Sequence, residues 1–170
     1  ASLQKKAASF KIGASGVSYK ITKTPAKASK YISVDKNGKV TLKKKAPAGT
    51  YVITVSKAGN ANYEDAKTAV TITVEKAGQK ITAKNSAKKV KVSAVKKKAV
   101  SYTIGAKAKG SLSYQISSTP NNAGKYISVT KKGKVTLKKG APKGTYVIRI
   151  TAKETSVYKK ATKNVKVTVK

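Results

Sequence analysis

Hydrophobic and polar residues alternate along much of the chain with a period of two. Residues 70–74 read VTITV and residues 165–169 read VKVTV, and the same alternation runs through residues 51–55 and 146–150. Successive side chains of a strand point to opposite faces of a sheet, so these stretches predict strands with one buried face. Helical spacing does not dominate any long stretch.

Turn residues separate these short runs. Asn37-Gly38 lies between YISV and KVTL, and the second copy of this stretch keeps the glycine as Gly133. Glycine supplies a positive φ at no steric cost, which predicts a hairpin at each position. Residues 47–49 and 142–144, each running from a proline to a glycine, predict the next turn. Short strands joined by regular turns are typical of a sandwich or a barrel.

The chain contains a long internal repeat. KYISVDKNGKVTLKKKAPAGTYVITV, residues 30–55, returns at 125–150 as KYISVTKKGKVTLKKGAPKGTYVIRI. Residues 18–75 align without a gap on 113–170, and residues 2–14 align on 94–106. Such self-similarity is the signature of duplicated structural units.

The repeat predicts two domains, residues 1–76 and 77–170, that meet near residues 75–79. Residues 80–92 (KITAKNSAKKVKV) have no counterpart in the first domain, so its first strand is expected to be missing or truncated. We expect the sequence to be an excerpt from a longer array with neighbouring domains.

One stretch resembles the segment that enters strand F of immunoglobulin domains. AGTYVITV, residues 48–55, is similar to it, with Ile53 and Ile148 where the disulfide cysteine would stand. This resemblance implies that Tyr51 and Tyr146 are tyrosine-corner residues, whose hydroxyls bond to nearby backbone.

The whole unit resembles the bacterial immunoglobulin-like repeats of secreted and surface-anchored proteins of Gram-positive bacteria. The matching pattern is an alternating first-strand region with a lysine cluster, then YTIGAKAKGSLSYQIS, the long repeated stretch, and the closing VYKKATKNVKVTV. It covers nearly all of residues 80–170 and most of 1–75. The resemblance implies an all-β fold of two tandem immunoglobulin-like β-sandwich domains and a secreted or cell-surface location. It leaves the ligand open.

The charge is strongly one-sided. Thirty-nine Lys plus Arg stand against five Asp plus Glu, giving a net charge of +34. Such a field attracts polyanions and repels copies of the chain, so we expect a monomer. Cysteine is absent, so the domains must fold on packing alone. No stretch approaches the length of an apolar membrane span, and we expect no membrane insertion.

The chain offers little material for catalysis. No acidic residue recurs in both copies, so neither a carboxylate pair for acid–base chemistry nor a calcium cage belongs to the repeat. Without His or Cys, zinc sites and triad nucleophile–base pairs are excluded. A Ser–Lys pair stays formally open among so many lysines, but nothing in the sequence singles one out. Glu64-Asp65 is expected to be solvated, and none of the five acids lies on an apolar strand face, where a Lys–Asn isopeptide bond would need one. We expect no enzyme activity, no cofactor and no metal.

Most tyrosines recur, which indicates structural roles. The recurring set is Tyr19, Tyr31, Tyr51 and Tyr63, matched by Tyr114, Tyr126, Tyr146 and Tyr158. Tyr102 corresponds to Phe10, a position that we expect in the core. A row of exposed aromatic side chains would instead mark a polysaccharide-binding face.

Several lysines also recur, and they have two interpretations. Lysines along strand edges block pairing with other chains. Alternatively, Lys39, Thr41 and Lys43 share one strand face and could form a polyanion-binding face. The candidate residues for this face are Lys36, Lys39, Lys43, Lys44, Lys131, Lys134, Lys138 and Lys139.

Sequence-specific nucleic-acid binding is not expected, because Arg149 is the single arginine and base readout prefers arginine. The expected partner is an anionic cell-wall polymer, such as teichoic acid, or a glycan. We expect a non-catalytic spacer module with adhesion through the lysine-rich face as an added role. The alternative is a module that binds polysaccharide or cell-wall polymer.

Overall fold

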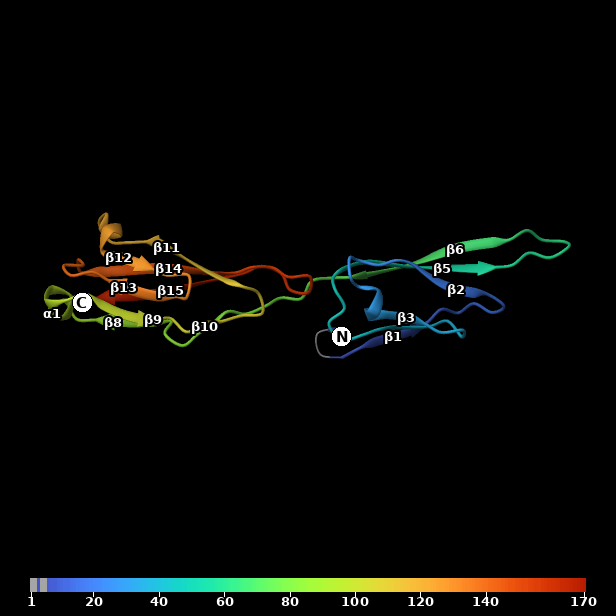
Figure 1. The fold of residues 1–170 in the computed structure, drawn as a ribbon, viewed down its shortest axis with the longest axis horizontal. Helices are drawn as coiled ribbons and strands as arrows, with labels where there is room; N and C mark the ends of the chain where they lie inside the picture. The colour runs from blue at the N-terminus through green and yellow to red at the C-terminus, as the bar shows by residue number, and fades with distance from the viewer. Residues whose placement is uncertain (1–2, 4–5) are drawn as a thin grey trace. The chain divides into compact units, whose positions relative to one another are not determined.

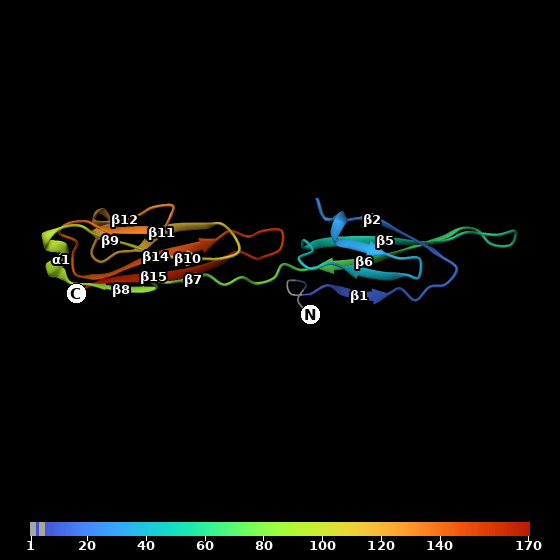
Figure 2. The same cartoon turned by 60° about the horizontal axis from the view of Figure 1, so that its bottom comes forward.

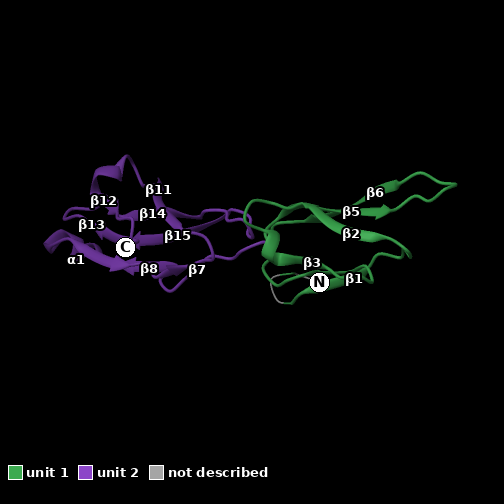
Figure 3. Cartoon of the chain, turned by 45° about the vertical axis from the view of Figure 1, so that its right-hand side comes forward, with its two compact units in different colours: residues 1–77 green, residues 78–170 purple. Residues whose placement is uncertain are grey.

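The computed structural model describes residue 3 and residues 6–170. Ser2, Gln4 and Lys5, which belong to the predicted repeat, lie outside the described residues. The chain divides into two compact units, residues 1–77 and residues 78–170, coloured green and purple in Figure 3. Each unit has its own sheets and its own hydrophobic core.

Unit 1 contains short strands and one 3-10 turn within its described residues. In chain order they are β1 (Ala8–Lys11), β2 (Ser18–Lys23), η1 (Ser29–Tyr31), β3 (Ile32–Val34), β4 (Lys39–Leu42), β5 (Gly49–Lys57) and β6 (Ala66–Val74).

Unit 2 repeats this order and places further elements in front of it (Figure 1). The elements that precede the repeated part are β7 (Thr82–Ala83), β8 (Ala87–Val90) and α1 (Val92–Lys97). The rest are β9 (Val100–Thr103), β10 (Ala106–Lys107), β11 (Leu112–Ser118), η2 (Ala123–Tyr126), β12 (Ile127–Val129), β13 (Lys134–Leu137), β14 (Gly144–Ala152) and β15 (Ala161–Val169).

Two antiparallel sheets form unit 1, with strand orders β1-β4-β3 and β2-β5-β6. The alternation of the sequence determines which side chains face inward. Val40 and Leu42 are buried, whereas Lys39 and Thr41 lie on the outer face of the first sheet. The two inner faces together supply one core.

Unit 2 has the same two sheets, with orders β12-β13-β9 and β11-β14-β15-β8, and a small pair β10-β7. Its distinctive feature is β8, which pairs in parallel with the outer edge of β15 (Figure 2). Among the described residues of unit 1, β6 pairs with β5 alone. The strand pairings confirm the predicted all-β, immunoglobulin-like sandwich.

Both predicted tyrosine corners are confirmed. Tyr51 and Tyr146 are fully buried, and each hydroxyl donates to a proline carbonyl four residues earlier. The distances are 2.8 Å from Tyr51 Oη to Pro47 O and 2.9 Å from Tyr146 Oη to Pro142 O. Burial raises the pKa of both phenols above its ordinary value, which further favours the protonated form that donates each bond.

The turns confirm one expectation and correct another. Gly38 and Gly133 adopt φ of 75° and 74° in the predicted hairpins. The second turn lies earlier than residues 47–49: Ala46 N donates to Lys43 O, and Gly49 already opens β5. The residue with positive φ is Lys45, at 63°, where unit 2 has Gly140 at 80°. Proline and glycine therefore form a bend, and the hydrogen-bonded turn precedes it.

Two further expectations were wrong. The alternating first-strand region of unit 2 contains a helical turn, α1, which lies at the same end of the unit as the C-terminus (Figure 1, Figure 2). Val95 is its buried residue, and Val92 N donates to Lys170 O. Phe10, expected in the core, is 42% exposed. Its counterpart Tyr102 is partly buried and packs against the core of unit 2.

Replacing buried tyrosines by phenylalanine should give opposite results at two positions. Tyr146→Phe removes the corner bond and leaves the Pro142 carbonyl without its donor, so we expect a loss of about 1–2 kcal/mol of unit 2 stability. Tyr102 Oη is buried without a hydrogen-bond partner, so Tyr102→Phe should gain about 1 kcal/mol. Urea unfolding followed at amide signals of each unit measures both. Equal losses in the two variants would contradict these assignments.

Exchanging the residues at the left-handed turn position should change the stability of the two units in opposite directions. Lys45→Gly relieves a strained φ and should stabilise unit 1 by about 1 kcal/mol, whereas Gly140→Lys should destabilise unit 2 by a similar amount. A Cβ at position 140 would meet only an ordinary contact with Tyr126, so the effect isolates the backbone. Thermal unfolding of each variant provides the measurement, and no change in either unit would refute the role of φ.

Candidate functional site

All eight candidate lysines are exposed, and they lie around the second strand of each repeated stretch, β4 or β13. In unit 1, Lys36 lies in the β3–β4 turn, Lys39 begins β4, and Lys43 and Lys44 follow its end. In unit 2, Lys131, Lys134, Lys138 and Lys139 occupy the aligned places around β13. The lysines therefore collect at the two ends of a central strand.

Hydroxyl groups fill the sheet face between these ends. Thr41 is paired with Ser9 on β1 and with Ser33 on β3. In unit 2, Thr136 pairs with Ser101 and Ser128, and the Thr136 and Ser101 hydroxyls lie 2.8 Å apart. Residues 39 and 43 are separated by about 13 Å along a strand. The result in each unit is a row of hydroxyl groups with ammonium groups beyond both ends.

The two faces differ in local charge. Lys39 is paired directly with Lys11 in unit 1, whereas the corresponding Lys134 pairs with Thr103. Like charges on directly opposite strand positions destabilise a sheet, so the Lys11–Lys39 pair does not serve stability. An anion between the two ammonium groups would relieve their repulsion.

One recurring lysine has a structural role outside this face. Lys30 Nζ lies 5.5 Å from the centroid of the Tyr31 ring, and Lys125 Nζ lies 5.4 Å from that of Tyr126. Both distances suit a cation–π interaction at an exposed site. The recurrence of this lysine therefore follows from its neighbouring tyrosine.

The acidic residues are exposed, and two of them shape loops. Asp35 Oδ1 accepts from Asn37 N and Lys39 N, both at 2.9 Å, and Asp65 Oδ1 accepts from Gly59 N at 2.7 Å. All five carboxylates are exposed, so none is the buried acid that an isopeptide bond needs. Within residues 3 and 6–170, no three His, Cys, Asp or Glu side chains cluster as metal ligands would.

Tyrosines do not form a binding platform in the part of the chain that the structure describes. Tyr63 is 75% exposed, whereas the others are partly or fully buried. A flat sugar-binding face needs several exposed aromatic rings in line. Tyr63 lies in the loop between β5 and β6, which Asn60 Oδ1 shapes by accepting from Asn62 N and Tyr63 N.

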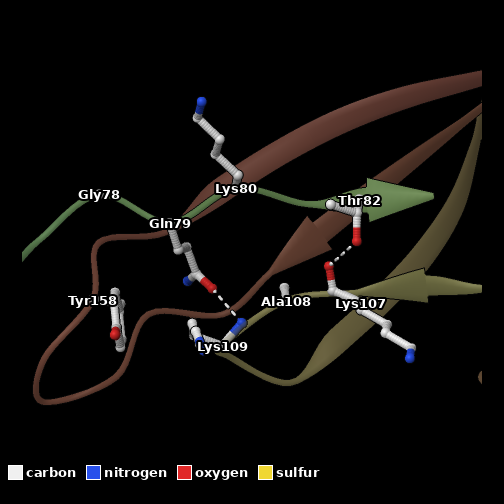
Figure 4. A pocket seen from close by; sticks show the side chains of 8 residues that line it. All are labelled: Gly78, Gln79, Lys80, Thr82, Lys107, Ala108, Lys109 and Tyr158. Atoms are coloured by element: carbon white, nitrogen blue, oxygen red, sulfur yellow. Dashed lines mark hydrogen bonds between the residues drawn. The ribbon is translucent and has the colours of Figure 1, made fainter. Parts of the chain in front are cut away.

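Unit 2 has an open pocket of about 470 Å³ at its start (Figure 4). Its lining consists of Gly78, Gln79, Lys80, Thr82, Lys107, Ala108, Lys109 and Tyr158. Gln79 and Tyr158 supply an amide and a phenol ring to the lining of the pocket, whereas the Lys80 and Lys107 side chains point away from these two in Figure 4. Sequence reasoning did not identify this pocket.

Gln79 uses its whole amide to hold two loops together. Its Nε2 donates to Lys153 O at 3.0 Å and Lys159 O at 2.8 Å, while its Oε1 accepts from Lys109 N at 3.1 Å and Gly110 N at 2.9 Å. Gly110 lies so close to Lys153 O that a Cβ would collide with it. Because both N–H groups and the oxygen of the amide are used in these bonds, the amide is not available to bind a ligand in the pocket. Its role is structural.

Gln79→Ala tests this structural role. It leaves backbone groups of both loops without partners, and we expect unit 2 to lose about 1–3 kcal/mol of stability. Gln115→Ala, at an exposed position of β11, is the matched control and should change stability by less than about 0.5 kcal/mol. Urea unfolding measures the free energy of unfolding of unit 2 in both variants. Equal losses would show that the Gln79 amide does not hold the two loops together.

Several solved structures of multidomain proteins are similar to this chain. Drosophila OTK extracellular domains 3–5 align with 12% identity over 99% of this chain and 58% of that one, with a TM-score of 0.46. Drosophila N-cadherin EC1–4 aligns with 16% identity over 91% of this chain and 41% of that one, with a TM-score of 0.42. The third structure is a SusE-like surface-located polysaccharide-binding protein from the Bacteroides thetaiotaomicron heparin utilisation locus. It aligns with 16% identity over 98% of this chain and 32% of that one, with a TM-score of 0.35.

The chain spans less than two thirds of the length of each of these proteins. No protein-family model and no curated protein sequence matches it. The assignment of each unit as an immunoglobulin-like β-sandwich rests on the strand pairings and tyrosine corners described above. No helix in the described part of the chain has the length and apolar character needed to cross a membrane.

Proposed function

We propose that this chain is a non-catalytic structural module of a secreted or surface-anchored protein of a Gram-positive bacterium, acting as a spacer beside neighbouring domains. The observation that carries the proposal is the role of the recurring residues. The corner tyrosines, the turn glycines and the lysines over Tyr31 and Tyr126 all stabilise the sandwich. A duplicated catalytic unit would instead repeat its reactive groups.

In a spacer, the exposed lysines need no ligand, because keeping the chain soluble is a sufficient role for them. Charged side chains on sheet surfaces oppose association, and a net charge of +34 keeps copies apart. Adhesion to an anionic cell-wall polymer through the lysine-rich face is an added role. It would use the lysine-rich strand ends and the hydroxyl rows between them.

A binding module for polysaccharide or cell-wall polymer is the second candidate. The Lys11–Lys39 pair favours it, because this arrangement destabilises the free sheet and would suit a bound anion. An extended polymer would fit the flat face better than a compact ligand. The isolated exposure of Tyr63 argues against stacking of a neutral sugar chain.

Two lysine-to-glutamine variants distinguish these candidates. The first replaces Lys36, Lys39, Lys43 and Lys44, and the control replaces four exposed lysines of the other sheet, Lys20, Lys23, Lys57 and Lys67. Affinities for teichoic acid, heparin, duplex DNA and a neutral glucan are measured across a salt series. For a spacer, both variants weaken binding of every polyanion equally, and each lost contact with DNA reduces the slope of log K against log salt by about 0.9.

A polymer that keeps its affinity at high salt, and loses it in the first variant alone, would overturn the spacer assignment. Such a result would establish a shaped site on the β1-β4-β3 sheet. Generic counterion release cannot produce it, because that contribution depends on how many phosphates are neutralised.

A further inference from the structure

The outer face of the β11-β14-β15-β8 sheet of unit 2 carries a row of three polar side chains, which we call the Arg149 row. Gln115 on β11 is paired with Arg149 on β14, and Arg149 is paired with Asn164 on β15. All three residues are exposed. Paired residues lie on the same face of a sheet, with Cβ atoms about 4.5–5.5 Å apart. An arginine side chain therefore stands between two carboxamide side chains.

These residue types are unusual for this chain at these positions. Arg149 is the single arginine, and every other basic residue is a lysine. Among the described residues, Asn164 is the asparagine that lies in a strand, whereas the others lie in turns and loops. Asparagine is depleted in strands, so it does not serve the stability of β15. The aligned row of unit 1 consists of Lys20, Thr54 and Ala69. Because unit 1 forms the same three strands with that row, the fold does not require the Arg149 row.

The neighbours of Arg149 on this face are neutral or basic. The positions diagonal to it include Ser113 on β11, and Thr162 and Lys166 on β15. Diagonal neighbours are about 7–8 Å apart, which is within reach of a long side chain. None of the described residues that pair with Arg149 or lie diagonal to it is acidic. The five N–H donors of the guanidinium group therefore have no carboxylate beside them on this face.

A hollow of about 310 Å³ begins at the next pair of residues along these strands. Its lining includes Ser113, Thr151, Lys153, Glu154 and Lys160. Ser113 and Thr151 are paired with each other, two positions from Gln115 and Arg149 on their strands. Side chains two positions apart on a strand lie on the same face, so the hollow adjoins the Arg149 row. The lining has two lysines and one acid, which favours an anionic or polar ligand.

We propose that this face of unit 2 binds an acidic polysaccharide, with Arg149 holding the carboxylate of one sugar residue. A guanidinium group and a carboxylate are both planar and form two parallel N–H···O bonds. Gln115 and Asn164 each offer N–H donors and an acceptor oxygen, and these match the hydroxyl groups that flank the carboxylate on a sugar ring. The adjoining hollow receives the next sugar residue of the chain.

This site differs from the lysine-rich face in position and in chemistry. The lysine-rich face of unit 2 belongs to the β12-β13-β9 sheet, whereas the Arg149 row belongs to the other sheet. A lysine ammonium group is a compact point charge, whereas the arginine fork matches the geometry of a carboxylate or a phosphate. The inference goes beyond the spacer role and does not rest on it, because the four-lysine variant of unit 1 leaves the Arg149 row intact.

The probe is a short oligogalacturonate added to the whole chain, and the matched neutral probe is an oligogalactan, which lacks the carboxylates. Both are titrated at high salt, where generic attraction to the lysines is largely screened. We expect saturable binding of oligogalacturonate, with NMR shift changes at the side-chain amides of Gln115 and Asn164. The oligogalactan should bind at least about tenfold more weakly, because it offers Arg149 no anion.

Two variants separate the arginine fork from net charge. Arg149→Lys keeps the net charge of +34 but loses the fork, and should weaken oligogalacturonate binding at least about tenfold. Lys134→Gln removes one positive charge from the other sheet and should leave the affinity at high salt unchanged. Both positions are exposed, so the urea midpoint of unit 2 should be unchanged in each variant, which excludes unfolding as the cause of lost binding.

Four results would overturn the proposal. They are equal binding of the oligogalactan, an unchanged affinity in Arg149→Lys, shift changes confined to the β12-β13-β9 sheet, and an absence of oligogalacturonate binding at high salt. Tighter binding of teichoic acid than of oligogalacturonate, with the same loss in Arg149→Lys, would also overturn it, in favour of a phosphate as the ligand of Arg149.

Discussion

The pairing at the edge of the closing strand is the interaction on which the packing of unit 2 depends. A sandwich of this kind ends one sheet on β6 or β15, and the outer edge of that strand exposes backbone groups beside the open side of the core. Unit 2 covers the edge with β8 and fully buries Val165 and Val167. In unit 1 the aligned Val70 and Ile72 of β6 are partly buried.

Most of the duplicated sequence is explained by folding. Tyr146 closes its corner, Gly133 permits its hairpin, and Lys125 covers Tyr126. The Lys11–Lys39 pair is a feature that the two units do not share, because the corresponding Lys134 pairs with Thr103. It suits an anionic polymer.

The sequence predicts the elements whose cause is local or periodic. One-sided burial imposes alternation on residues 70–74, and glycine at 38 marks a turn, so both were predicted correctly. α1 was missed because its six residues bury only Val95, too little for a helical period to show. Gln79 donates to the carbonyls of Lys153 and Lys159, which lie 74 and 80 positions away in the sequence. A local sequence pattern does not predict hydrogen bonds between residues so far apart. The alignment of Phe10 with Tyr102 predicts an aromatic side chain at both positions, but it does not predict how exposed each side chain is.

The most direct measurement is the stability of unit 2 in a chain with Val90→Lys, which places an ammonium group at the buried position of β8. Lys89→Ala, at the exposed neighbouring position of the same strand, is the control. Amide signals of each unit are followed through a urea titration. If the packing of unit 2 depends on the strand that covers β15, the urea midpoint of unit 2 falls in the first variant alone, with the midpoint of unit 1 unchanged. An unchanged midpoint for unit 2, or an equal fall with Lys89→Ala, would contradict this account.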